Sequence, residues 1–572
     1  MSNSSTQDAP VDRLPMEIWD QVLLEIMDVE YQLDPHPHLG GERFPAEICA
    51  VSRRWHQRFN HILYHRFDFK NLFGEIKSLW CLLRTLVARP DLAALFREIT
   101  MFSPRFAQDF ANLESPEAKQ QLTTLYQENR DMVRQAMIQA RFDLAALPGG
   151  DLTLSATRYL SCDVNDLDMN YHLNHVAALR ALVLAHAPKI ERLSLQALAH
   201  DPFFERILHV ARAPSDRNSP GIAFQHLQTL NVAPNSIRDP YLGSSRIIHN
   251  GQTFISRNRQ YHRLPKLTEF TLLEGRIDLN AVQHRTALKK LSLPDIQNYL
   301  PQITPLLSLS SDLRQLSISS SYERGPVFHS KFWTAIAHLK DKLEYLDFFE
   351  TPYPFMPNQT RYFHEVDENF SLCPPLPEFT KLHVLKTNPL IIYGHNCKKH
   401  DEKLAETEET IATPNKLASH MPPNLESLGL YVKRSAWMSS YIKEFETGLE
   451  GIVLDAAPRR KLTHILVDNT DRIPLGKMRA AAQLHGIPFV GPREAMACGG
   501  RDTIFADQAK PGNPLTHQSD PNMFRNLYFA EMIPVRMKVH SIDGMLENVH
   551  EWKRKRVDPP DFRTAEAKRA RH

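Results

Sequence analysis

The chain lacks the cysteine spacing of a disulfide framework or a zinc site. It contains no C-x-x-C pair, and its six cysteines are scattered over positions Cys49, Cys81, Cys162, Cys373, Cys397 and Cys498. Scattered cysteines fit reduced thiols. Long hydrophobic runs are missing too, since no stretch approaches the ~18 apolar residues that cross a bilayer. The first residues, MSNSSTQDAP, have neither the basic nor the apolar part of a signal peptide. We therefore expect a soluble protein of the cytoplasm or nucleus, with no membrane partner.

An excess of charge of one sign is also missing. The 572 residues include 68 basic and 66 acidic side chains, which gives a formal net charge of +2. A nearly balanced surface argues against a protein that coats nucleic acid, so we expect no nucleic-acid partner. Glycine is sparse, with 21 residues against 40 prolines, and this ratio predicts many turns and rigid connections.

Signatures of catalysis and of metal binding are absent as well. The sequence has no G-x-x-x-x-G-K-[ST] loop for phosphate and no G-x-S-x-G nucleophile turn. The stretch HEVDE, from His364, lacks the second histidine of a zinc-binding H-E-x-x-H motif. HNCKKH offers His395, Cys397 and His400, but no second cluster completes a set of four ligands. We predict no catalytic residue, no metal and no cofactor.

What is present is a recurring six-residue motif, the repeat phrase. Apolar residues occupy positions 1 and 4, and with one exception position 6, of stretches such as IERLSL and LKKLSL. The exception is Thr387, in LHVLKT. Position 4 is held by Leu193, Leu230, Phe270, Leu291, Leu316, Leu346, Leu385, Leu428 and Ile465, with steps that vary from 21 to 43 residues.

The pattern L-x-x-L-x-L predicts a short strand whose alternate residues point into a shared core. One such unit cannot bury its apolar face, so the units must stack. We therefore predict an α/β fold in which residues 171–495 form an irregular leucine-rich-repeat solenoid of strand–helix repeats. An ordinary α/β domain with leucine in its strands is the alternative. The polar stretches 234–263, 351–377 and 391–421 are expected to be inserted loops, which either shape a partner site or have no role.

The N-terminal part predicts a small helical module. Residues 1–10 are small and polar, which indicates a disordered leader. From Leu14 on, Ile18, Val22 and Ile26 recur at four-residue steps, the apolar stripe of an amphipathic helix. Pro15 suits the first helical position, which leaves Leu14 as an apolar group at the helix mouth. A second helical pattern from about residue 44 completes a module over residues 11–69.

The segments that flank the repeats carry less information. Residues 70–170 read as a helical linker or N-terminal cap, in which LWCLLRTLVARPDLAALFREITMF predicts a helix, a break at Pro-Asp, and a short helix running into a strand. Residues 496–572 read as a largely irregular tail with two basic clusters, WKRKR (Lys553 to Arg556) and KRAR (Lys568 to Arg571). These clusters fit a nuclear-import signal or a plain solubilising tail equally well.

The N-terminal residues also resemble a known family. RLPMEIWDQVLLEIM, followed by AVSRRWHQRF, resembles an F-box, and LYHRFDF and LLRTLVARPDLAALFREI are similar to segments that follow it in filamentous-fungal F-box proteins with leucine-rich repeats. This resemblance implies a non-catalytic subunit of a Skp–cullin–F-box (SCF) ubiquitin ligase. Its F-box would bind the Skp-type adaptor of the cullin-RING ligase, and its repeats would hold the protein client to be ubiquitinated and degraded. The implied adaptor-binding residues are Leu14, Pro15, Ile18, Val22, Ile26, Val51 and Trp55.

The chain departs from the F-box pattern in the spacing of the two segments that resemble it, LP and the tryptophan helix. Leu14 and Trp55 are 41 residues apart, longer than the pattern usually allows, with DPHPHLGGE as the apparent insertion. Such a loop is either extruded at little cost or weakens adaptor binding. Two alternatives stay open. The apolar stripe of the first helix could pack only within a local core instead of meeting the adaptor. The whole chain could instead be a leucine-rich-repeat scaffold outside any ligase, capped by the F-box-like helices.

Overall fold

The computed structural model describes only part of the chain, in two compact units of residues 1–270 and 271–572. The predicted leader (1–10) and tail (496–572) lie outside the described residues. So does the predicted helical module up to residue 59. The described residues are 60–61, 64–69, 76–101, 116–147, 149–163, 171–196, 201–212, 223–233, 264–272, 285–296, 300–320, 329–350, 376–387, 421–430, 451, 462, 464–467, 476–487 and 489–490.

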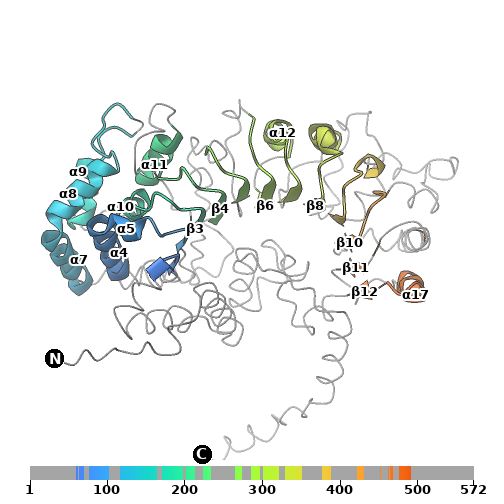
Figure 1. Cartoon of the computed structure of the whole chain (residues 1–572), viewed down its shortest axis with the longest axis horizontal. Helices are drawn as coiled ribbons and strands as arrows, with labels where there is room; N and C mark the ends of the chain where they lie inside the picture. The colour runs from blue at the N-terminus through green and yellow to red at the C-terminus, as the bar shows by residue number, and fades with distance from the viewer. Residues whose placement is uncertain are drawn as a thin grey trace, which may run out of the picture. The chain divides into compact units, whose positions relative to one another are not determined.

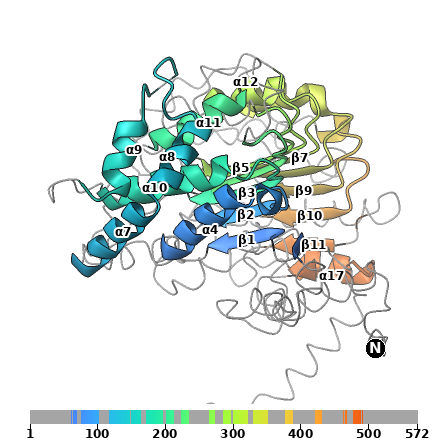
Figure 2. The same ribbon diagram turned by 60° about the vertical axis from the view of Figure 1, so that its left-hand side comes forward.

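The first unit contains parallel strands that pair in the order of the sequence. They are β1 (Arg66–Phe69), β2 (Glu98–Met101), β3 (Arg192–Gln196) and β4 (Thr229–Ala233). Figure 2 shows β1, β2 and β3 lying side by side. Ile99 pairs with Leu193, and Leu193 pairs with Leu230, so apolar residues form a continuous row on one face. The unit boundary falls inside β5 (Glu269–Leu272), whose Glu269 and Phe270 belong to this unit.

The helices of the first unit gather beside these strands in Figure 1. Helix α10 is buried all round: its residues Val176–Leu184 have exposed fractions of 0 to 1%. It packs against α4, α9 and α11, which explains why its sequence, YHLNHVAALRALVLA, has no polar side. The helices are α4 (Ile76–Ala88), α5 (Pro90–Ala93), α7 (Pro116–Glu128), α8 (Arg130–Gln139), α9 (Thr153–Leu160), α10 (Tyr171–Ala185) and α11 (Pro202–Arg212).

Two buried arginines join α10 and α11 to their surroundings. Arg180 forms an ion pair with Asp201, and both side chains are fully buried. Asp201 also accepts a hydrogen bond from the N–H of Phe204 (2.9 Å) and thereby caps the start of α11. Arg206 donates to the backbone carbonyls of Arg141 (2.7 Å), Leu144 (2.9 Å) and Gly150, so it fixes the loop between α8 and α9.

The second unit has the same arrangement of parallel strands in sequence order. Register continues without interruption from β6 to β12, apart from one irregularity between Leu293 and Ile296. The strands are β6 (Lys290–Ile296), β7 (Gln315–Ser320), β8 (Tyr345–Glu350), β9 (Val384–Thr387), β10 (Ser427–Leu430), β11 (His464–Val467) and β12 (Phe489–Val490).

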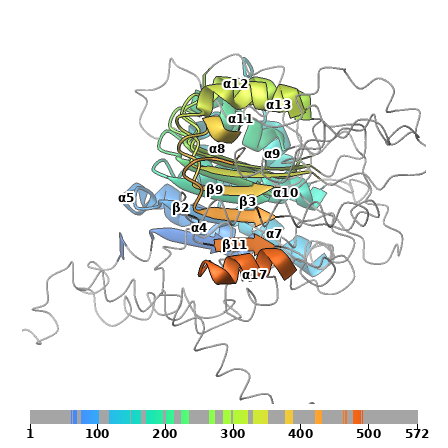
Figure 3. The same cartoon turned by 90° about the vertical axis from the view of Figure 1, so that its right-hand side faces the viewer.

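Helices cover the apolar face of these strands. Figure 3 shows α12 (Leu300–Leu309) and α13 (His329–Ile336) packed side by side, and α17 (Gly476–Leu484) beside the last strands. The ring of Phe332, on α13, stacks on that of Phe348, on β8, with centroids 4.3 Å apart. Two short 3₁₀ helices, η4 (Ala337–Leu339) and η6 (Leu376–Glu378), lead into β8 and β9.

The predicted mixed α/β class with strand–helix alternation is confirmed at this level, with a parallel sheet. Two boundaries differ from those expected. Residues 66–69, placed in the all-helical module 11–69, form β1 because their alternating apolar side chains, Phe67 and Phe69, pair with the apolar face of β2. The boundary between the units, at 270/271, falls inside the expected 171–495 domain. Among the described helices, none has the length and apolar character needed to cross a bilayer.

Candidate functional site

The residues that the F-box resemblance assigns to adaptor binding lie outside the described part of the chain. They are Leu14, Pro15, Ile18, Val22, Ile26, Val51 and Trp55. The rejected metal motifs at His364 and at His395, Cys397 and His400 lie outside it too, as do the basic clusters at Lys553 to Arg556 and Lys568 to Arg571. Within the described ranges, no group of three or more histidine, cysteine or acidic side chains has the geometry to hold a metal ion.

The residues expected at position 4 of the repeat phrase all lie in strands and are buried. In the first unit, Leu193 and Leu230 pair on adjacent strands, and Phe270 lies buried in β5. In the second unit the register brings the others into one row, which Phe489 of β12 continues. That row is Leu291, Leu316, Leu346, Leu385, Leu428 and Ile465, each no more than 1% exposed.

The same pair of backbone hydrogen bonds is found at the start of strand after strand. The carbonyl of the residue just before one strand accepts two N–H groups from the start of the next, as Arg97 does from Glu191 (2.8 Å) and Arg192 (2.9 Å). The equivalent acceptor carbonyls are those of His65, Arg97, Glu191 and Gln228 in the first unit, and Lys289, Arg314, Glu344 and His383 in the second. Because these bonds recur at one position, they align the residues that precede the strands along one edge of each unit.

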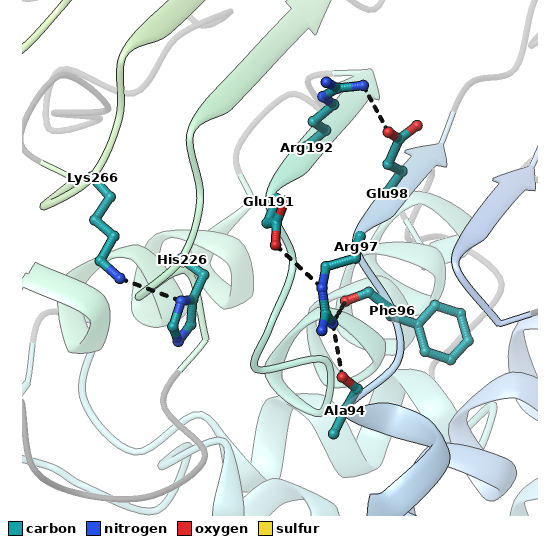
Figure 4. Close-up of polar contacts among 8 residues, drawn as sticks. All are labelled: Ala94, Phe96, Arg97, Glu98, Glu191, Arg192, His226 and Lys266. Carbon is teal, nitrogen blue, oxygen red and sulfur yellow. Dashed lines mark hydrogen bonds and ion pairs between the residues drawn. The ribbon is translucent and has the colours of Figure 1, made fainter. Parts of the chain in front are cut away.

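Crossed ion pairs occupy this edge in the first unit (Figure 4). Nε of Arg97 lies 3.2 Å from the Glu191 carboxylate, and Nη1 of Arg192 donates to Glu98 at 2.8 Å. Arg97 also donates to the backbone carbonyls of Ala94 (2.8 Å) and Phe96 (3.0 Å), which holds its guanidinium in place. Such partly exposed pairs contribute only about 0–1 kcal/mol each, so they add little to the stability of the unit.

Two histidines at the same edge, His65 and His226, have a lowered pKa. Burial lowers the pKa of His65, and the nearby carboxylate of Glu98 opposes this effect. The pKa of His226 is lowered by burial and then by the ammonium of Lys266, whose Nζ lies 3.3 Å from Nδ1 of His226. An ammonium can only donate, so Nδ1 accepts and the His226 proton lies on Nε2.

The face opposite the leucine row carries a polar row in the second unit. Residues at the middle of successive strands pair in register, from Ser317 through Asp347 and Lys386 to Gly429. The Asp347 carboxylate accepts a hydrogen bond from Ser317 (3.1 Å) and lies 4.0 Å from Nζ of Lys386. Lys386 is also placed over the ring of Tyr345, 5.1 Å from its centroid. Asp347 and Lys386 are both buried, so the row is an internal polar contact that joins neighbouring strands.

Two repeat units were missed in the sequence because an aromatic residue, Tyr64 or Phe96, holds position 1, where the nine recognised phrases have leucine or isoleucine. Tyr64, Phe67 and Phe69 hold positions 1, 4 and 6 around β1, and Phe96, Ile99 and Met101 do so around β2. The rings of Tyr64 and Phe96 meet edge to face at 5.9 Å, so the position-1 residues of these units pack on each other. A pattern that also admits aromatic residues at position 1 would have found both.

Comparison of the chain with models of known protein families, with curated proteins and with solved structures found no match. Functional inference therefore depends on the residues and geometry described above.

Proposed function

We propose that the chain is the client-binding subunit of an SCF ubiquitin ligase. The F-box-like segment would bind a Skp-type adaptor, and the strand repeats would be leucine-rich repeats that hold a protein client. The subunit would act by tethering: it raises the effective concentration of a client lysine at the charged ubiquitin-conjugating enzyme and contributes no catalytic group.

One observation carries this proposal: an F-box-like sequence precedes repeats with a shared core row. β1 begins at Arg66, a few residues after AVSRRWHQRF, and strands with leucine at position 4 follow in sequence order. A repetitive sheet with a leucine core suits the holding of another protein. The core row of the described strands supports the client-binding part of the proposal. The adaptor-binding part is tested by co-purification.

The experiment is co-purification with the adaptor. We expect the double variant Leu14→Ala/Pro15→Ala to lose the Skp-type adaptor, because both side chains would lie at the adaptor contact. Leu154→Ala is the matched control, since it removes the same side-chain atoms from a leucine that is 71% exposed elsewhere in the chain. Both variants should keep the wild-type melting temperature. Adaptor binding that survives in the double variant would refute the assignment.

A scaffold outside any ligase is the second candidate. It is favoured by the direct passage from the F-box-like segment into β1, as expected if that segment caps the repeats. Deletion of residues 1–59, which spares β1, separates the two. If the segment is a cap, its deletion should lower the solubility and the melting temperature of the repeats. If it is an adaptor-docking module, neither should change.

A further inference from the structure

Three successive repeats of the first unit begin with the same tight turn. The N–H of Ile190 donates to the carbonyl of Ala187 (3.4 Å), and the N–H groups of Leu227 and Leu267 donate to carbonyls three residues earlier at 3.3 Å. Proline precedes the third residue of two of these turns, in APKI and LPKL, which suits its fixed φ angle. The third residues of the turns are Lys189, His226 and Lys266, all exposed.

These three residues form a row that we call the basic row. Its members sit at equivalent positions of successive repeats, so neighbours are spaced by roughly the 4.8 Å between adjacent strands. The arginines at the starts of the strands differ from this row. Arg97, just before β2, pairs with Glu191, and Arg192, the first residue of β3, pairs with Glu98. Within the described residues, no carboxylate forms an ion pair with Lys189 or Lys266. The two lysines of the basic row therefore present to solvent positive charge that no described carboxylate pairs with.

We propose that the basic row of Lys189, His226 and Lys266 is the docking site for an acidic segment of a partner protein. This inference rests on the proposed function, in which the acidic segment belongs to the client. Carboxylates on the partner would supply the anions that the row lacks, and the ordered turns beneath it fix the backbone positions from which the side chains extend.

The surroundings of the row favour an acidic peptide over nucleic acid. Two lysines and one histidine cannot match the ~6–10 phosphate contacts typical of strong nucleic-acid binding. Glu191 directly precedes β3 and acts electrostatically on His226, and Glu269 begins β5; both would repel a continuous phosphate backbone. A short run of carboxylates can instead contact the cations and avoid these side chains.

His226 gives the site a pH signature. In the free protein Lys266, Lys189 and Arg97 disfavour its protonated form, Glu191 favours it, and burial lowers its pKa further. A bound carboxylate would favour the protonated ring, so binding takes up a proton and tightens as the pH falls. Glutamate side chains on the partner stay ionised over this range, because their ordinary pKa is about 4.3.

The test measures binding of a fluorescent polyglutamate peptide to the full chain without adaptor. We expect Lys189→Glu/Lys266→Glu to weaken binding at least about tenfold, a loss of about 1.4 kcal/mol. The matched control Lys77→Glu/Arg84→Glu makes the same charge change on two exposed residues of α4 and should change affinity less than about twofold. Equal loss in both variants would overturn the site, since it would mean attraction by net charge alone.

Two further readouts complete the test. Affinity of the wild-type chain should rise between about pH 8 and pH 6, and His226→Gln should remove most of this rise. No pH dependence, or an unchanged one in the variant, would overturn the role of His226. An oligothymidylate of equal charge that binds more tightly than the peptide would overturn the choice of partner. Because no adaptor is present, failure here is distinct from failure of the ligase assignment.

Discussion

Thr387 offers a direct test of how the leucine row stabilises the second unit. It holds position 6 of its repeat, where the other repeats place an apolar residue, and pairs with Phe348 and Leu430 on the neighbouring strands. Its side chain is 2% exposed, and within the described structure its hydroxyl has no hydrogen-bond partner. A buried unsatisfied hydroxyl costs about 1–3 kcal/mol.

Replacement of this hydroxyl by a methyl group keeps the shape and removes the cost. We therefore expect Thr387→Val to raise the free energy of unfolding by about 1 kcal/mol, at the lower end of that range, because neighbours relax around the hydroxyl in the native chain. The change should appear as an increase of about 2 °C in the melting temperature. Hydrogen exchange would localise the gain, because amides of β8, β9 and β10 should exchange more slowly.

Two controls separate this effect from a general gain in hydrophobicity. Thr387→Ser keeps the hydroxyl and loses a buried methyl group, so it should lower the free energy of unfolding by about 1 kcal/mol. Thr380→Val makes the same change at an exposed position of the second unit and should have little effect. A Thr387→Val chain that is no more stable than the wild type would refute the reasoning.

A Cβ on Gly429 would lie 2.9 Å from Cγ of Lys386, so we expect Gly429→Ala to lower the free energy of unfolding by about 1–3 kcal/mol in denaturant melts; an unchanged midpoint would contradict this. Asp201→Asn removes the carboxylate that forms an ion pair with the buried Arg180, which should cost about 3–5 kcal/mol, and Arg180→Met in the same chain should recover much of it, a recovery measured by the same melts. Burial lowers the pKa of His186, so the unfolded state binds the proton more tightly, and stability should fall as the pH drops below about 6.5; His186→Gln should flatten this profile in thermal melts at several pH values.

The core of the repeats could be predicted from sequence because it depends on local spacing. Leu291 and Leu316 fall at the same position of the same phrase, and parallel register then places them side by side. The sequence also showed Thr387 as the exception at position 6 of the phrase. It did not show that the Thr387 hydroxyl is buried. The first two repeats were missed because Tyr64 and Phe96 hold position 1, where the recognised phrases have leucine or isoleucine.

The polar features could not be predicted because they depend on which strands become neighbours. Arg192 and Glu98 are 94 residues apart and meet only when β2 pairs with β3. Lys386 faces Asp347 for the same reason, although each looks like an ordinary surface residue in its own phrase. Long-range register, rather than local pattern, decides which charges compensate each other and which remain available.

Direct binding of the adaptor is the most decisive measurement for the central claim. The purified chain is mixed with a purified Skp-type adaptor and analysed by size-exclusion chromatography with in-line light scattering. The ligase assignment predicts a complex that contains one copy of each protein, and its loss in the Leu14→Ala/Pro15→Ala variant. Separate elution of the two wild-type proteins at micromolar concentration would contradict it.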